Sequence, residues 1–375
     1  MNDKRFDTVI IGAGQGGLAV GHYLARSDHR FVILDALHRV GDNWRRHYDS
    51  LKLYNPAKFN GLPGMSFPAP RWSFPTRDQV ADFLEVYAAE FELPVRTGVK
   101  VDRLARNGVG YLVTAGDDRF QADNVVVATG TFGRPYTPAF TKELDSEIVQ
   151  LHSSEYKNPS QLRPGPVLVV GAAHSGADIA LEVVAAGHET VLSGRDTGQV
   201  PFDIESPRTR LLWPVLSFVS RRVLTIRTPM GRKIRPKIRA HGGPLLRVKT
   251  RDLQTAGVKR VFERTIGVEE DRPVLDGDRT LDVANVIWCT GFRQRFEWID
   301  LPVIGEDGWP LERRGVVESS PGLYFMGLAF QYSFGSTLFI GVKHDAAYVA
   351  RHIVRRMANG RTPVTTAAVD VTTPR

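Results

Sequence analysis

Two glycine-rich loops in this sequence have the residue types and spacing that bind phosphate groups. The first runs from Gly12 to Gly17 and the second from Gly171 to Gly176, and each follows a short apolar run and opens a stretch with helical periodicity. The backbone N–H groups at the start of a helix lack intrahelical partners and lie at the positive end of the helix dipole, so they bind anions. The pattern predicts that one chain holds two dinucleotides.

The first loop is the closer match to the dinucleotide-binding pattern. It follows an expected buried strand at Thr8–Ile11 and has glycines at positions 12, 14 and 17, which is the G-x-G-x-x-G spacing. Gly12 allows the tight turn, Gly14 lets the backbone approach a pyrophosphate, and Gly17 lets the next helix pack closely on the strand. That helix is expected over residues 15–26, with the diphosphate at its start.

An acidic residue follows the first loop at the distance that ribose recognition requires. The apolar run Phe31–Leu34 is expected to form the next strand, and Asp35 lies at its carboxyl end. An acid about 20 residues after the glycines hydrogen-bonds the ribose hydroxyls. Strand, loop, helix, strand and acid occur in order, which favours a nucleotide site over a glycine-rich turn of some other α/β domain.

The second loop differs from the first at its middle position. Gly171 and Gly176 keep their places, but Ala173 replaces the central glycine, and its methyl group is expected to crowd the diphosphate slightly. Ser175 opens a stretch to residue 186 with apolar side chains at helical spacing. We therefore expect a second, less regular nucleotide site here.

The residues after the next expected strand favour one nicotinamide cofactor over the other. Thr190–Leu192 reads as a strand, and Ser193 and Arg195 follow it where the first fold has an acid. A hydroxyl and a guanidinium group attract a ribose 2′-phosphate, whereas an acid repels it. The second nucleotide is predicted to be NADPH rather than NADH, although Asp196 weakens this preference and Arg195 is also compatible with an ordinary surface role.

The bulk composition narrows the function classes. The 375 residues are 42% hydrophobic and 24% charged, which is ordinary for a globular protein of two domains. Cys289 is the single cysteine, so the chain has no dithiol pair and no internal disulfide, and no His and Cys cluster has zinc spacing. No signal sequence and no apolar run of about 18 residues is present, so an intracellular, cytoplasmic protein is expected, with contact to the inner face of the membrane left open.

One segment carries more than the whole net charge of +8. Residues 208–251 hold 13 Lys and Arg and no Asp or Glu, together with the apolar stretch Leu211–Val219. Such a segment can cover part of the core with solvated arginines at its edge, lie on an anionic membrane, steer an acidic substrate, or form a contact in a homodimer. No nucleic-acid-reading motif is present, so nucleic acid is not an expected partner.

Two further apolar runs indicate how the domains are connected. Val125–Gly130 and Val286–Gly291 each end in Thr-Gly and read as a strand followed by a glycine turn. They predict an α/β protein with two Rossmann-like domains, the second inserted into the first. The expected parts are residues 1–161 (first domain), 162–285 (second domain, with a basic insertion at 201–251) and 286–375 (remainder of the first domain and a C-terminal tail).

The order of these motifs resembles the flavin-containing (class B) monooxygenases, a family that includes bacterial members and the plant indole-3-pyruvate monooxygenases. Besides the two loops, the resemblance rests on Gly41–Trp44, Leu62–Gly64, Phe74–Arg77, the two Thr-Gly turns and Pro321–Gly327. It covers nearly the whole chain and implies FAD on the first loop and NADPH on the second. Trp44, Thr129 and Gly130 are then expected to contact FAD, and Thr290 and Gly291 to contact NADPH or to lie between the domains.

The family signature between the loops is only half present. Its second half remains as His152–Tyr156, but Ser146 and Ile148 occupy the positions of the family's Phe and Gly. In the family this histidine couples nicotinamide binding to domain geometry, so the resemblance implies a conformational role for His152. It also aligns Asn55 with an asparagine that acts near the flavin, although an Asn before Pro is equally a routine turn residue.

The activity that the resemblance implies is a transfer of one oxygen atom from O2, through a flavin C4a-hydroperoxide, to a small organic substrate. The reaction would be N- or S-oxygenation or the oxidation of a carbonyl compound. The incomplete signature leaves a second interpretation open, an FAD-dependent NADPH reductase or oxidase that passes electrons to O2, a quinone or a partner. A third interpretation is a flavin-loaded, membrane-associated sensor or partner protein.

Overall fold

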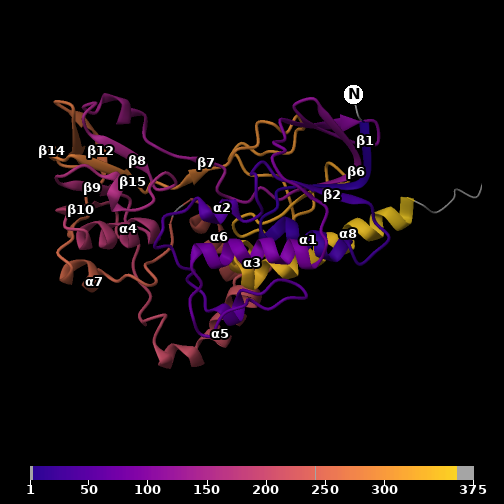
Figure 1. The fold of residues 1–375 in the computed structure, drawn as a ribbon, viewed down its shortest axis with the longest axis horizontal. Coiled ribbons are helices and arrows are strands. Elements are labelled where there is room, and N and C mark those ends of the chain that lie inside the picture. Colours follow the sequence, from indigo (N-terminus) through magenta and orange to yellow (C-terminus); the bar gives the residue numbers. More distant parts are fainter. Residues whose placement is uncertain (1–2, 241, 361–375) are drawn as a thin grey trace, which may run out of the picture.

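The computed structural model describes residues 3–240 and 242–360. Its largest sheet contains β1, the strand that leads into the first glycine loop (Figure 1). The strand order is β3-β2-β1-β6-β5-β4, and β17 pairs with β6. The strands are β1 (Asp3–Ile11), β2 (Phe31–Leu34), β3 (Val95–Arg96), β4 (Arg103–Asn107), β5 (Gly110–Ala115), β6 (Asp118–Val127) and β17 (Leu323–Phe325). The central pairs are parallel, and the carboxyl-terminal halves of β1 and β6 are buried together with β2 and β17, which explains why these parts of the sequence are continuous apolar runs.

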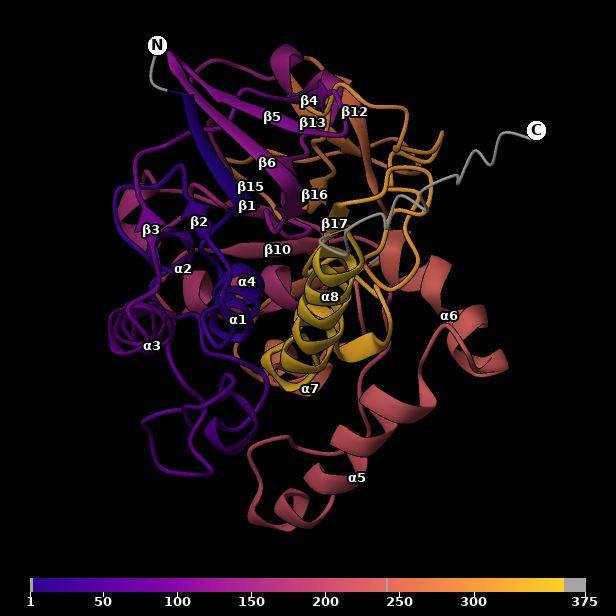
Figure 2. The same cartoon turned by 90° about the vertical axis from the view of Figure 1, so that its right-hand side faces the viewer.

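Helices cover one face of this sheet. They are α1 (Gln15–Leu24), α2 (Asp42–Arg45), α3 (Arg77–Glu90) and α8 (Phe339–Gly360). The helices α1 and α8 pack side by side, and together with α3 they bury a core that includes Leu18, Phe83 and Val349 (Figure 2). Thr76 begins α3 with a reciprocal capping box to Gln79. The helix predicted at 15–26 corresponds to α1, which ends two residues earlier, at Leu24.

A second sheet surrounds the second glycine loop, and all its strands are parallel, in the order β11-β10-β9-β15-β8. Its strands are β8 (Val149–His152), β9 (Val167–Val170), β10 (Thr190–Ser193), β11 (Lys259–Val261) and β15 (Asn285–Trp288). The helices α4 (His174–Ala185) and α7 (Thr250–Thr255) pack against each other beside it. A small antiparallel sheet follows, with β12 (Thr265–Glu269), β13 (Arg272–Leu275) and β14 (Arg279–Thr280).

The chain crosses between the two sheets twice, as the Thr-Gly turns predict. The short strands β7 (Arg134–Pro135) and β16 (Phe292–Arg293) pair antiparallel where the two crossings meet (Figure 1). The second sheet extends beyond the expected range of 162–285 at both ends, because β8 and β15 hydrogen-bond within it. The C-terminal tail that was expected at 361–375 lies outside the described residues.

The basic segment folds as an excursion that leaves the second sheet and packs on the first domain. It contains η4 (Pro207–Leu211), α5 (Trp213–Phe218), the π-helical turn η5 (Val219–Val223) and α6 (Pro229–Ala240). We refer to residues 201–251 as the insertion. Figure 2 shows α5 and α6 beyond α8, on the side away from α1. No helix in the part of the chain that the structure describes has both the length and the apolar character needed to cross a membrane.

The insertion is held to the first domain by backbone and side-chain contacts. Ile226 N–H donates to the Tyr332 carbonyl at 2.9 Å, and Phe334 N–H donates to the Leu224 carbonyl at 2.9 Å. The Trp213 ring is buried against Phe59, with 6.0 Å between the ring centroids. The basic segment therefore does more than present solvated arginines, because part of it is a packed element of the first domain.

The remaining short helical turns lie in the connections. They are η1 (Ala57–Phe59), η2 (Ala139–Glu143), η3 (Pro159–Gln161) and η6 (Phe334–Thr337). The aromatic-rich stretch 41–77 contains only α2 and η1 and is otherwise irregular, as its lack of periodicity predicts. This stretch lies between the two nucleotide folds and supplies contacts to both of them.

Candidate nucleotide-binding sites

The three glycines of the first loop have different structural reasons for being glycine. Gly12 has φ +111°, and a Cβ there would lie 2.6 Å from the Ala128 carbonyl oxygen. A Cβ on Gly17 would lie 1.9 Å from the Gly12 carbonyl oxygen, so the close packing of α1 on β1 requires its absence. A Cβ on Gly14 would meet only Asn43 Nδ2, at 3.8 Å. The protein itself therefore leaves open space over Gly14, which is where the sequence pattern places a diphosphate.

The start of α1 has the electrostatic character of an anion site. Gly14 is its N-cap, no side chain caps the helix, and no acidic residue lies in its first turn. The N–H groups of that turn and the positive end of the helix dipole thus face a position that protein side chains do not neutralise. A phosphate group fits this site on both counts.

Asp35 lies beside the first loop, as predicted, and it also supports the loop. Its Oδ2 accepts a hydrogen bond from Ala13 N–H at 2.6 Å, and its Oδ1 accepts one from Leu37 N–H at 2.8 Å. Each carboxylate oxygen can accept a further hydrogen bond. The residue is half-buried, so this geometry is compatible with ribose binding in addition to the support of the turn.

The residues expected to contact FAD surround this loop. The Trp44 indole N–H is buried and lacks a hydrogen-bond partner among the described residues. A buried donor without a partner costs about 1–3 kcal/mol, so a ligand that accepts from it would remove a penalty. Thr129 and Gly130 follow β6 at the edge where Gly12 meets Ala128, and Gly130 has φ +77°. The group fits a dinucleotide, and these contacts remain predictions.

The second loop repeats the backbone geometry of the first. Gly171 has φ +106°, and a Cβ on Gly176 would lie 1.7 Å from the Gly171 carbonyl oxygen. Ala173 is the N-cap of α4, which has no side-chain cap and no acid in its first turn. Ser175 lies in that first turn. The start of α4 is therefore a second position suited to phosphate.

A neighbouring segment partly covers the second loop, which the sequence did not predict. A Cβ on Gly242 would lie 2.5 Å from the Ala173 Cβ, so the insertion lies against the methyl group that replaces the central glycine. The Pro244 carbonyl lies 2.6 Å from His174 Nε2, at the first residue of α4. The surroundings of Ala173 are therefore set by the insertion as well as by the loop.

The structure corrects the role expected for Ser193. Its side chain is fully buried, and its hydroxyl donates to the Glu263 carbonyl at 2.9 Å and lies 3.1 Å from Thr265 Oγ1. It joins β10 to the next segment and does not present a hydroxyl to a ribose phosphate. Arg195 remains exposed on the turn that follows.

Arg260, which sequence reasoning missed, holds the turn that carries Arg195. Its guanidinium group donates to the Gly194 carbonyl at 2.5 Å and to the Arg195 carbonyl at 3.2 Å. Burial lowers the pKa of Arg260 from its ordinary value. Its only sequence signal was an arginine in the parallel strand next to β10, which is too weak to identify it.

His152 is a buried connection between the two crossings. Its Nδ1 accepts from Ser154 N–H at 3.1 Å, so we assign the ring proton to Nε2, which donates to the Gly291 carbonyl at 3.1 Å. Burial lowers the pKa of His152, which favours the neutral ring. Thr290 donates its hydroxyl to the Tyr136 carbonyl in the same turn. The placement between domains agrees with the conformational role that was expected of His152, and that role stays a prediction.

The stretch that contains Asn55 meets the second nucleotide fold through a buried acid. Tyr54 donates its hydroxyl to Asp178 Oδ2 at 2.7 Å, and Tyr48 donates to the same oxygen at 3.3 Å. Arg247 lies 3.8 Å from this carboxylate. Burial raises the pKa of Asp178, while the Tyr54 hydrogen bond and the Arg247 charge lower it. Sequence reasoning missed this cluster because its members are far apart in the chain and match no motif.

Asn55 lies next to this interdomain cluster. Its carbonyl accepts from Asn60 Nδ2 at 2.9 Å, which fixes the turn, and its neighbour Tyr54 lies 4.9 Å from His174 between ring centroids. The position places Asn55 near the start of α4. The structure shows a turn role for its backbone, and the catalytic role of its side chain remains a prediction.

Comparison with known proteins identifies the family. The family described as pyridine nucleotide-disulphide oxidoreductase matches residues 9–211, which include both glycine loops. The chain belongs to this oxidoreductase family. Cys289 is the single cysteine of the sequence, and burial raises the pKa of its thiol.

The similarity extends over nearly the whole chain. An uncharacterized CzcO-like oxidoreductase of Geobacillus kaustophilus is 38% identical over 350 residues, covering 93% of this chain and 98% of that one. A probable indole-3-pyruvate monooxygenase, YUCCA3 of Arabidopsis thaliana, is 27% identical and covers 90% of this chain and 86% of its own. The solved flavin-containing monooxygenase of Stenotrophomonas maltophilia has a TM-score of 0.75 at 26% identity, over 94% of this chain and 99% of that one. The predicted resemblance to flavin-containing monooxygenases is confirmed, and so is the Rossmann-type α/β fold.

Proposed function

We propose that this oxidoreductase binds FAD at the first glycine loop and NADPH at the second, and transfers one oxygen atom from O2 to a small organic substrate. The observation that carries the proposal is the open, uncapped start of α1 over Gly14. The buried Trp44 N–H, which has no partner among the described residues, follows Asn43, the residue nearest to that open space. A second uncapped helix start, at α4, supports a second nucleotide. When bound, the flavin supplies the redox chemistry, with NADPH as the source of electrons and O2 as the oxidant.

The protein's own residues would bind, orient and shield these groups. The N–H groups at the starts of α1 and α4 hold the diphosphates, and Asp35 orients the ribose of the first nucleotide. His152 and the Tyr54–Asp178 pair fix how the second fold meets the first. The aromatic side chains of 41–77 provide the dry wall that excludes water from the reacting centre.

We also propose that the second domain comprises the strands from β8 to β15, with the insertion attached to it.

Oxygen transfer to substrate distinguishes the proposed activity from its main alternative. An FAD-dependent NADPH reductase or oxidase is favoured by the incomplete signature, since Ser146 and Ile148 replace its Phe and Gly. Flavin-loaded protein would be incubated with NADPH, isotopically labelled O2 and a panel of amines, sulfides and ketones. A monooxygenase places the label in a product. Quantitative return of the NADPH electrons as hydrogen peroxide with every compound would instead identify an oxidase.

The preference for NADPH is proposed to depend on Arg195. Replacing it by alanine is expected to raise KM for NADPH about tenfold, the loss of one charge-assisted contact, and to leave KM for NADH within about twofold. Lys259→Ala is the matched control, because Lys259 is an exposed cation on the neighbouring strand β11. Equal changes for the two cofactors would contradict the assignment.

Peripheral binding to an anionic membrane through 208–251 remains a second proposal. The outer face of η4 and α5 exposes Leu211, Val215 and Phe218, and Met230 is exposed at the start of α6. These side chains lie in a segment that has 13 basic and no acidic residues. Apolar side chains with a basic surround are typical of proteins that bind the membrane interface.

Vesicle sedimentation tests this proposal. The double substitution Leu211→Ser with Phe218→Ser is expected to abolish binding to phosphatidylglycerol vesicles. Val109→Ser is the control, since Val109 is exposed at 88%, compared with 83% for Leu211 and 56% for Phe218, but lies in the turn between β4 and β5 of the first sheet. Concentration-dependent dimerisation that the double substitution removes, without vesicle binding, would show instead that this face joins two copies in a homodimer.

A further inference from the structure

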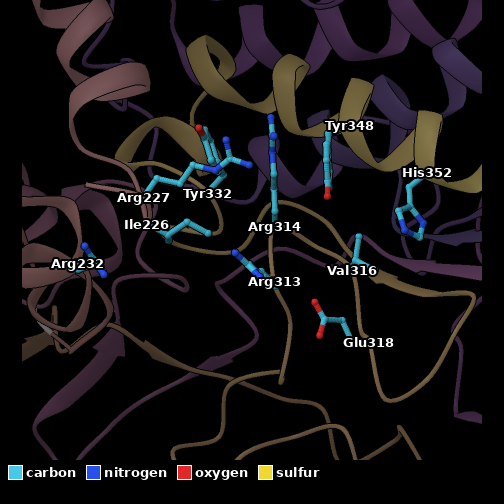
Figure 3. A pocket seen from close by; sticks show the side chains of 10 residues that line it. All are labelled: Ile226, Arg227, Arg232, Arg313, Arg314, Val316, Glu318, Tyr332, Tyr348 and His352. Atoms are coloured by element: carbon cyan, nitrogen blue, oxygen red, sulfur yellow. The ribbon is translucent and has the colours of Figure 1, made fainter. Parts of the chain in front are cut away.

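A pocket of about 480 Å³ lies between the insertion, the loop at 313–318 and α8 (Figure 3). It contains none of the residues assigned to the two nucleotide sites. The helix α1, which carries the first glycine loop, packs on α8 on the side away from α6 (Figure 2). The volume falls in the range of pockets that bind small molecules. The pocket is therefore a separate cavity with its own chemistry.

The charge in this pocket is strongly unbalanced. Four arginines line it, and Glu318 is its single carboxylate. Arg227, Arg232 and Arg313 form no salt bridge with any carboxylate in the part of the chain that the structure describes. By contrast, Arg235 and Arg239 on the same insertion both pair with the buried Glu312. Glu312 thus pairs with the arginines that dock α6, whereas no carboxylate among the described residues pairs with Arg227, Arg232 or Arg313.

The fourth arginine, Arg314, is fixed in place by aromatic rings. Its guanidinium carbon lies 4.2 Å from the centroid of the Tyr332 ring and 4.0 Å from that of Tyr348, and Figure 3 shows it standing between the two. Its charge also acts on the buried Asp345, whose pKa it lowers against the larger effect of burial. Its Nε is buried and has no partner among the described residues. Arg314 therefore builds the wall, while Arg227 and Arg313 provide cations toward the cavity.

The backbone at this wall is also unusual. Arg314 has φ +56°, a left-handed conformation that few non-glycine residues adopt, and Gly315 follows at φ +86°. The turn is held by Gly315 N–H, which donates to Glu312 Oε2 at 2.7 Å. Arg313 and Val316 also hydrogen-bond to each other on either side of this pair, so Arg314 and Gly315 are the central residues of a tight hairpin turn, which needs a positive φ at both positions.

We propose that this pocket binds a small multiply charged oxyanion, a phosphate or a polycarboxylate, independently of the nucleotide sites. Arg227 and Arg313 would bind its oxygens, because the planar guanidinium group matches carboxylate and phosphate in a bidentate geometry. The Tyr332 and Tyr348 rings and Ile226 would pack against the carbon skeleton of a polycarboxylate, which inorganic phosphate lacks. The same oxygens are offered by a free metabolite and by a lipid headgroup, and the test separates the two sources.

The test is calorimetric titration of the full-length, flavin-loaded protein with citrate and with inorganic phosphate. Binding is expected for citrate, and more weakly for phosphate. Arg227→Gln and Arg313→Gln should each weaken citrate binding about tenfold, the value of one charged contact. Arg222→Gln is the matched control, an exposed arginine of the insertion outside the pocket, and should change the affinity less than about twofold. Unchanged thermal unfolding of all three variants shows that they fold.

The possible results of this titration distinguish a site for a free anion, a site for a lipid headgroup and the absence of such a site. Citrate binding that the two pocket substitutions weaken, and Arg222→Gln does not, supports a site for a free anion. If citrate and phosphate do not bind, but phosphatidylglycerol vesicles bind and the pocket substitutions alone release them, the pocket holds a lipid headgroup. Equal effects of all three substitutions, or no binding of any of these ligands, would overturn the proposal.

Discussion

At the scale of single residues, the glycines of the first loop are required for two different reasons. Some positions lack room for a Cβ because of the fold itself, and one position has room that a ligand would fill. Gly12 and Gly17 are crowded by backbone atoms of the protein itself. Gly14 is not, since the nearest atom to a Cβ there is 3.8 Å away. The glycine pattern in the sequence therefore has two causes. Gly12 and Gly17 are needed for packing, and Gly14 is needed for the approach of a diphosphate.

This difference predicts opposite results for two substitutions. Gly17→Ala should destabilise the fold by about 1–3 kcal/mol, because its methyl group would overlap the Gly12 carbonyl. Gly14→Ala should leave the free energy of unfolding of the flavin-free protein within about 1 kcal/mol, yet weaken flavin binding at least about tenfold. Denaturant unfolding and the flavin content of the purified protein measure the two effects. A Gly14→Ala protein with full flavin content would rule out the assigned loop.

At the scale of elements, α6 is joined to the first domain through one buried carboxylate. The Glu312 side chain is fully buried and lies 3.2 Å from the Arg235 guanidinium and 3.3 Å from that of Arg239. Burial lowers the pKa of Arg239 to about 10 and raises that of Glu312. The Arg239 guanidinium also lies 4.1 Å from the centroid of the Trp309 ring. These contacts dock the insertion, which the second domain carries, onto the first domain.

Removing this carboxylate should therefore release α6. Glu312→Gln removes the buried carboxylate that both arginines contact and leaves Arg239 only the weaker charge of Asp307, which is expected to cost about 3–5 kcal/mol. Limited proteolysis should then cut within 207–240 much faster than in the unaltered protein. Glu306→Gln, an exposed acid in the same region of the chain, is the control and should change neither stability nor cleavage. Cleavage at an unaltered rate in Glu312→Gln would show that the backbone contacts alone hold the insertion.

At the scale of the whole molecule, imidazole side chains whose pKa values are lowered in the folded state give the stability of the fold a dependence on pH. Burial, followed by the charges of Lys157 and Arg77, lowers the pKa of His47 to about 4, and burial with neighbouring cations lowers that of His344 to about 4. Burial also lowers the pKa values of His22, His152, His174 and His352. In the unfolded chain these rings titrate near 6.5. The unfolded state therefore binds more protons than the folded state at mildly acidic pH.

The sign of the effect follows from this difference. The contribution of these rings to stability is fully present above about pH 6.5 and is lost as the pH falls toward 4. Denaturant unfolding across that window should show a falling free energy of unfolding. His47→Gln is expected to flatten the decline, while His38→Gln, at an exposed position, should not. An unchanged slope in His47→Gln would mean that other groups cause the acid sensitivity.

The sequence by itself determined the local parts of this protein. The two glycine loops, the buried strands before them, the acid at residue 35 and the inserted arrangement follow from spacing and apolar periodicity over short distances. These features depend on neighbouring residues and on backbone sterics, so they can be predicted from the sequence alone. The resemblance to flavin-containing monooxygenases rested on the order of such motifs and was confirmed for the same reason.

Only the tertiary structure decided which distant side chains share an environment. Ser193 was expected at a phosphate, and burial beneath Glu263 turned its hydroxyl inward instead. The carboxylates at 178 and 312, each paired across more than 70 residues of chain, have no local pattern that marks them. The arginine pocket likewise forms where four separate segments meet, at residues 226–232, 313–318, 332 and 348–352. Burial and long-range pairing depend on how whole elements pack together, so local sequence patterns do not predict them.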